Sequence, residues 1–99
     1  MEHWLTTPNE VAKILADRHK NLRLSKKWKR TTLSNRSGVS VASLIRFEQT
    51  AQISLENFLK LLFALGRLDE VDDLLQSQVA KSIDDLENQV IKNPKRGSI

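Results

Sequence analysis

The side chains best suited to binding chemistry in this 99-residue chain are Lys and Arg residues that cluster in one segment. Between Arg18 and Phe47 there are nine basic residues and no Asp or Glu. Guanidinium and ammonium groups donate hydrogen bonds to phosphate oxygens and neutralise their charge. Residues 54–90, in contrast, carry eight acids against three basic residues. A charge division of this kind predicts one face for a polyanion and another face for a different partner.

We expect no catalytic centre, cofactor or metal site. His3 and His19 have no carboxylate or nucleophile at a recognisable spacing, and the three glycines form no phosphate-binding loop. The chain lacks cysteine, which excludes disulfides, thiolate zinc sites and cysteine nucleophiles. Acidic neighbours such as Asp69 and Glu70 would point about 100° apart on a helix, so they do not converge on an ion. The sequence therefore favours a binding protein over an enzyme.

The pattern of apolar residues predicts an all-α fold with five helices. Thr7 can cap a first helix over about residues 8–24, with Pro8 at its first position and Glu10 completing a capping box. Its buried side is expected to consist of Val11, Ile14, Leu15 and Leu22. Arg23 and His19 are expected on its solvated side, and Trp28 in the following loop is expected to pack under the next helix. A later helix should begin after Ser54 and close at Gly66.

The residue pattern from Arg30 to Glu48 is typical of a helix-turn-helix. Gly38 supplies the positive φ that ends a first short helix, Val39 fills the corner, and Ser40 can cap the second helix. Leu44 and Phe47 anchor that second helix to the core. Its outer face keeps the residues Val41, Ala42, Ser43 and Arg46. In a DNA-binding helix-turn-helix, these positions enter the major groove.

These residues divide the work of DNA binding between affinity and selectivity. Lys29 and Arg30, at the start of the first short helix, are placed to meet a phosphate. Val41 and Ala42 can read only shape and thymine methyl groups, whereas Ser43 can donate or accept at several base edges. Arg46 is the only long donor on the face, and guanine and phosphate are equally open as its target. The predicted DNA-binding residues are Lys29, Arg30, Ser40, Val41, Ala42, Ser43 and Arg46.

An apolar stripe follows the predicted domain and extends towards the C-terminus. Its spacing of three and four residues predicts a fifth helix that follows Gly66, and a dimer or partner surface. The alternative is that the part from Leu68 to Leu75 folds back on the first and fourth predicted helices. The residues assigned to this surface are Leu68, Val71, Leu74, Leu75 and Val79. We expect a helix-turn-helix domain at residues 7–75 and a C-terminal extension at 76–99. That extension should contain a possible further helix at 82–91 and a mobile basic tail at 93–98.

Two sets of residues resemble known proteins. Leu33, Arg36, Gly38 to Ser40, Leu44, Arg46 to Glu48 and Ala64 to Gly66 resemble the Cro/C1-type (XRE) helix-turn-helix family, which has a lambda repressor-like fold. More narrowly, Arg46 to Thr50, Ile53 to Glu56 and Leu65 to Leu75 resemble the HipB-like antitoxins of HipA-kinase toxin–antitoxin modules, in two-component or three-component form. The family usually has Ser or Thr followed by Gln where Lys29 and Arg30 stand, so the second helix loses a side-chain cap.

The resemblance implies a homodimeric repressor that binds an inverted-repeat operator in double-stranded DNA. It also implies a HipA-like serine/threonine kinase toxin as partner, in some systems with a third small subunit. An alternative is an interaction module that inhibits or scaffolds the kinase, with DNA binding secondary. A kinase gene beside this one would favour the operon repressor, and kinase inhibition by a variant that no longer binds DNA would favour the alternative.

Other classes of function fit the sequence less well. RNA binding is open to any basic domain, but single-strand readers generally use several aromatic side chains and the basic segment offers only Trp28. No apolar run approaches the roughly 20 residues that span a bilayer, and the first residues do not resemble a signal peptide. These features predict a cytoplasmic protein, and the resemblance to HipB-like antitoxins implies a bacterial one associated with the nucleoid.

Overall fold

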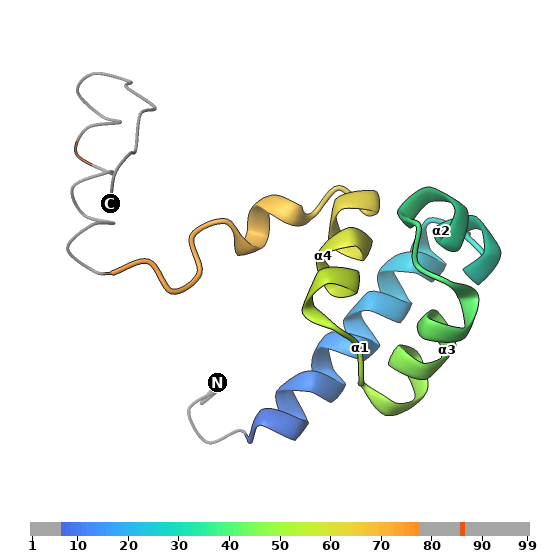
Figure 1. Ribbon diagram of the computed structural model, residues 1–99, viewed down its shortest axis with the longest axis horizontal. Helices are drawn as coiled ribbons and strands as arrows, with labels where there is room; N and C mark the ends of the chain where they lie inside the picture. Colours follow the sequence, from blue (N-terminus) through green and yellow to red (C-terminus); the bar gives the residue numbers. More distant parts are fainter. Residues whose placement is uncertain (1–6, 78–85, 87–99) are drawn as a thin grey trace. The chain divides into compact units, whose positions relative to one another are not determined.

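The computed structural model describes residues 7–77 and residue 86, and its regular structure is entirely helical within that part of the chain (Figure 1). The elements are α1 (Pro8–Ser25), α2 (Arg30–Ser37), α3 (Val41–Thr50), α4 (Leu55–Ala64) and the 3-10 helix η2 (Leu68–Val71). The all-α class is therefore confirmed. The chain divides into two units between Leu68 and Asp69, whereas the sequence placed the boundary at residue 75.

Helix α1 begins where its capping residues predict. The Thr7 hydroxyl accepts from the Glu10 backbone N–H at 3.2 Å, and the Glu10 carboxylate accepts from the Thr7 N–H at 3.0 Å. Pro8 occupies the first helical position, where its missing N–H costs nothing. The predicted capping box is confirmed.

Short connections position the next three helices. Gly38 ends α2 with a φ of 82°, in the left-handed region that glycine enters without steric cost. Ser40 caps α3 and Ser54 caps α4, each through its side-chain oxygen. Lys29 precedes α2 without a side-chain cap, as the sequence predicts. Helices α2 and α3 are therefore separated only by Gly38, Val39 and Ser40.

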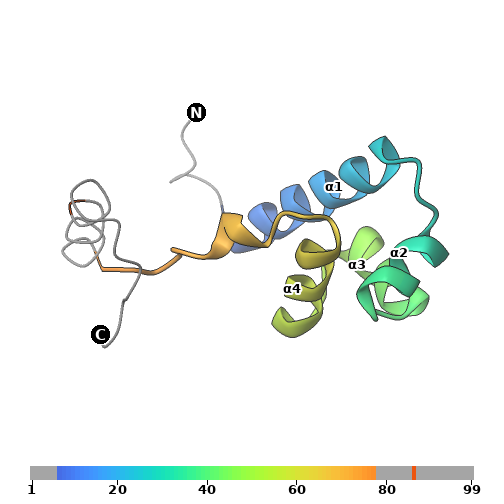
Figure 2. The same cartoon turned by 90° about the horizontal axis from the view of Figure 1, so that it is seen from above.

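The core of the first unit lies where α1 packs against α3 and where α2 packs against α3 and α4 (Figure 1 and Figure 2). Phe47 of α3 contacts Phe58 of α4 edge to face, with ring centroids 5.8 Å apart. The buried apolar residues are Ala16, Leu33, Val39, Leu44, Phe47, Leu61 and Leu65. Burial of Leu33, Val39, Leu44 and Phe47 fixes the two helices of the predicted helix-turn-helix segment in the core.

The buried side of α1 differs from the prediction. Val11 and Leu15 are 40% and 38% exposed, while Ala16, His19 and Arg23 face the core. These three residues lie three and four positions apart, so they share one face that is turned by about one residue, or about 100°, from the predicted face. Ile14 and Leu22 are half-buried. The prediction from apolar residues alone placed the buried face wrongly, because this face includes the polar side chains of His19 and Arg23.

The prediction of a fifth α-helix after Gly66 is wrong for the described residues up to Ser77. Leu68–Val71 forms a 3-10 helix, turns follow it, and Leu75 has a φ of 65°. Leu74 and Leu75 are 65% and 101% exposed, so these two side chains lack the packing that would stabilise a helix. Four of the five residues from Asp69 to Asp73 are acidic, and like charges on one helix face oppose helix formation.

Several predictions concern residues outside the described part of the chain. They are Val79 in the partner surface, the helix at 82–91 and the basic tail at 93–98. Among the described helices, none is both long and apolar enough to cross a membrane.

Candidate nucleic-acid interface

Helix α3 presents a polar face that starts close to its N-terminus. Ala42, Arg46 and Gln49 are exposed, whereas the predicted base readers Val41 and Ser43 are half-buried. Gln49 is missing from the sequence prediction. The spacing of Ala42, Arg46 and Gln49, at four and then three residues, identifies it, because such positions lie on one side of a helix.

Two hydrogen bonds join Ser40 and Ser43 at the start of α3. The Ser40 hydroxyl accepts from the Ser43 backbone N–H at 3.1 Å and donates to the Ser43 hydroxyl at 3.0 Å. This arrangement satisfies an N–H group at the helix start and fixes the direction of the Ser43 side chain. Ser43 still has a proton to donate because it acts here as the acceptor.

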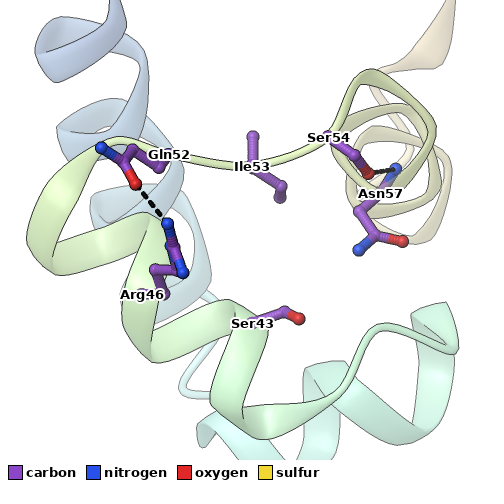
Figure 3. Close-up of a pocket in the computed structure, with 6 residues that line it drawn as sticks. All are labelled: Ser43, Arg46, Gln52, Ile53, Ser54 and Asn57. Atoms are coloured by element: carbon purple, nitrogen blue, oxygen red, sulfur yellow. Dashed lines mark hydrogen bonds between the residues drawn. The ribbon is translucent and has the colours of Figure 1, made fainter.

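A polar hollow of ≈ 220 Å³ lies beside this face, between α3 and the beginning of α4 (Figure 3). Ser43 of α3 and Asn57 of α4 lie on opposite sides of it, and Arg46 lies at its edge beside Gln52. The Ser54 hydroxyl accepts from the Asn57 N–H at 3.1 Å, which caps α4 at the same place. Gln52, Ser54 and Asn57 were not predicted as part of this site, because nothing in the local pattern shows that the start of α4 returns to α3.

The basic segment surrounds Trp28. The Arg36 guanidinium lies 4.5 Å from the centre of the indole ring and the Lys26 ammonium lies 5.4 Å from it. Trp28 is half-buried against the core, which confirms its predicted packing. Lys29 is exposed before α2, and the Arg30 side chain is one-third exposed. Cation–π contacts hold Arg36 and Lys26 in place while their charges remain near solvent.

Glu48 of α3 is the centre of a buried ionic cluster. Its carboxylate accepts from Arg23 Nε at 2.9 Å and Arg23 Nη2 at 3.0 Å, and from Arg30 Nε at 3.1 Å. The Arg23 guanidinium also donates to the Trp28 carbonyl at 2.9 Å. The Glu48 side chain is only 1% exposed and that of Arg23 only 6%. We name His19, Arg23, Arg30 and Glu48 the Glu48 cluster.

This cluster corrects two predictions from the sequence. Arg23 and His19 were expected in solvent, but they are 5% and 4% exposed. Arg23 is buried because its bidentate pairing with Glu48 and its bond to the loop carbonyl compensate for the loss of water. The His19 ring packs against Phe47 at 5.1 Å between centroids, with its Nδ1 atom 3.4 Å from the Glu48 carboxylate.

Burial and neighbouring charges change the pKa values of two members of the Glu48 cluster. Burial alone would raise the pKa of Glu48, but hydrogen bonds from Arg23 and Arg30, with the charge of Arg23, lower it below its ordinary value. Burial lowers the pKa of His19, and the charge of Arg23 adds to this effect against the opposite influence of Glu48. The structure therefore favours a charged Glu48 and a neutral His19.

The arrangement leaves the surface of the basic segment without an exposed carboxylate. Glu48 is the only acid between Arg18 and Leu55, and its side chain is buried. No group of three His, Cys, Asp or Glu residues that could hold a metal ion occurs among residues 7–77 and residue 86. Comparison of the chain with models of protein families, with curated proteins and with solved structures gives no match.

Replacing Glu48 by Gln should destabilise the fold by about 3 kcal/mol, because the buried Arg23 guanidinium loses its counter-charge. The matched control is Glu56→Gln, which removes an exposed pairing with Lys60 at 3.5 Å and should cost less than about 0.5 kcal/mol. Urea unfolding of both variants measures the difference. Equal effects of the two substitutions would contradict the importance assigned to the Glu48 cluster.

Stability should fall as the pH drops below 6.5, the ordinary pKa of histidine. Because the folded pKa of His19 is lowered, the unfolded chain takes up a proton in this range before the folded chain does, and the loss can reach about 1.4 kcal/mol per pH unit. The lowered pKa of Glu48 adds a second loss below 4.5. Urea midpoints at about pH 7.5 and about pH 5.5 test the first loss. His19→Phe should abolish it, and an unchanged loss in that variant would assign it to other groups.

Proposed function

We propose that this protein is a sequence-specific DNA-binding repressor, in which α2 and α3 form a helix-turn-helix and α3 enters the major groove. The observation that carries the proposal is the exposed face of Ala42, Arg46 and Gln49 on a surface without an exposed carboxylate from Arg18 to Leu55. Donors and small side chains on a helix are suited to base edges, and flanking cations are suited to phosphates.

The rigid attachment of α3 supports this proposal. Its N-terminus is capped by Ser40, its inner face is buried through Leu44 and Phe47, and Glu48 ties it to α1 and α2. Base recognition needs side chains held in a defined position relative to the phosphate contacts. Lys29 remains the expected phosphate contact. Arg30 has a second role, since its Nε atom pairs with Glu48 while the rest of its guanidinium is part-exposed.

The proposal includes a homodimer and a second protein partner. One helix-turn-helix contacts few bases, so dimers normally place two recognition helices about 34 Å apart, one turn of DNA. Leu74 and Leu75 are exposed and Val71 is half-buried, which leaves apolar surface for such contacts. The resemblance to HipB-like antitoxins favours an operon that also encodes a HipA-like kinase. The acidic residues from Asp69 to Asp73 make this segment a poor phosphate surface and a suitable protein surface.

Selection from duplexes with a randomised central segment tests the proposal. The wild-type protein should enrich an inverted repeat, with affinity that falls as salt is added. Arg46→Ala should lower discrimination at one base pair per half-site by about 1–3 kcal/mol and leave binding to random DNA almost unchanged. The control Arg18→Ala removes a charge of the same kind at an exposed position of α1, outside the proposed recognition face. Failure of the wild-type protein to enrich any sequence would contradict the proposal.

A further inference from the structure

Gln52 lies just beyond α3 and belongs to the edge of the polar hollow. We infer that Gln52 positions the Arg46 guanidinium for base recognition and is thereby a specificity-determining residue. This inference rests on the proposed function. It assigns to Gln52 a role that acts through Arg46 and that needs no DNA contact of its own.

A closed set of hydrogen bonds joins the two residues. Arg46 Nη2 donates to Gln52 Oε1, as the dashed line in Figure 3 marks. Thr50 connects their backbones, because its hydroxyl donates to the Arg46 carbonyl at 2.7 Å and accepts from the Gln52 N–H at 3.3 Å. Gln52 is thus held at its backbone and in turn holds the end of the Arg46 side chain.

The backbone brings Gln52 back beside the last turn of α3. Ala51 ends the helix with a φ of 63°, a left-handed backbone conformation that residues other than glycine rarely adopt. Ala51 and Ile53 both pack against the core, one on each side of Gln52. The residues that flank Gln52 are therefore anchored, and the strained turn is maintained by the surrounding structure.

The chemistry of the pair settles which groups remain for DNA. A guanidinium has only donors, so the Gln52 amide must present its oxygen to Arg46, and its nitrogen is directed elsewhere. Arg46 keeps its remaining N–H groups in the plane that Gln52 fixes. A fixed, donor-only edge matches the two acceptors of guanine, O6 and N7, and matches adenine less well because adenine offers a donor beside its N7. Among the four bases, the pairing therefore favours guanine as the target of Arg46.

Because this pair is exposed, the effect of Gln52 on the position of Arg46 can be measured separately from any effect on folding stability. Arg46 and Gln52 are both exposed, and hydrogen bonds at the surface contribute little to folding. Removing the Gln52 side chain should consequently leave thermal unfolding unchanged and affect only the freedom of Arg46. A merely structural residue would change the unfolding temperature instead.

The test compares Gln52→Ala with Gln52→Glu by selection from the randomised duplexes and by titration of the enriched duplex. Gln52→Ala removes the acceptor, and preference for guanine at the Arg46 base pair should fall roughly 3- to 10-fold while binding to random DNA stays within about twofold. Gln52→Glu keeps the acceptor and adds a negative charge. It should weaken binding to all duplexes alike and preserve the guanine preference. Asn21→Ala, on the exposed side of α1, is the matched control for loss of an amide side chain.

NMR signals of the Arg46 Nε–H group in the free protein supply a readout that does not need DNA. They should show an ordered side chain in the wild type and in Gln52→Glu, and a mobile one in Gln52→Ala. A guanine preference that Gln52→Ala retains would overturn this inference alone, as would parallel losses of preference and thermal stability in both Gln52 variants. A wild-type protein that enriches no sequence would overturn the proposed function, and the role of Gln52 with it.

Discussion

The burial of one carboxylate, that of Glu48, is the constraint on which the rest of the first unit depends. Arg23 of α1 and Arg30 of α2 both donate hydrogen bonds to this carboxylate, and Arg23 also donates to the carbonyl of Trp28 in the connecting loop. A buried ion pair adds little net stability compared with apolar packing, but leaving one partner alone is costly. The pairing therefore specifies how α1, α2 and α3 are placed relative to one another, and the apolar core stabilises that placement.

The same contact shapes the surface. Because Glu48 is taken out of solvent, the basic segment shows cations without an exposed acid, and two of its cations are used internally. Arg36 and Lys26 are held by the indole of Trp28, and Arg46 is held by Gln52. The proposed DNA surface thus includes charges with defined positions beside the exposed Lys29, and positioned charges suit the recognition of a particular duplex.

The local features could be predicted from the sequence, and the long-range pairings could not. The caps at Thr7, Ser40 and Ser54 and the turn at Gly38 each depend on residues within a few positions, and all were predicted correctly. Arg23 and Glu48 lie 25 positions apart, so only the fold brings them together. The spacing of apolar residues from Leu68 to Leu75 predicted a helix because such spacing places side chains on one face. A helix of this kind is stabilised by packing of that face, and the side chains of Leu74 and Leu75 are exposed instead.

The central claim is that the exposed face of α3, which Glu48 holds in place, contacts DNA. The most direct measurement is an NMR titration of the isotopically labelled full chain with its enriched duplex, in which each backbone amide reports its own change. We expect the largest changes at Ala42, Arg46 and Gln49, with little change at the exposed residues Val11 and Lys13 of α1. Largest changes at these two residues, with α3 unaffected, would contradict the claim.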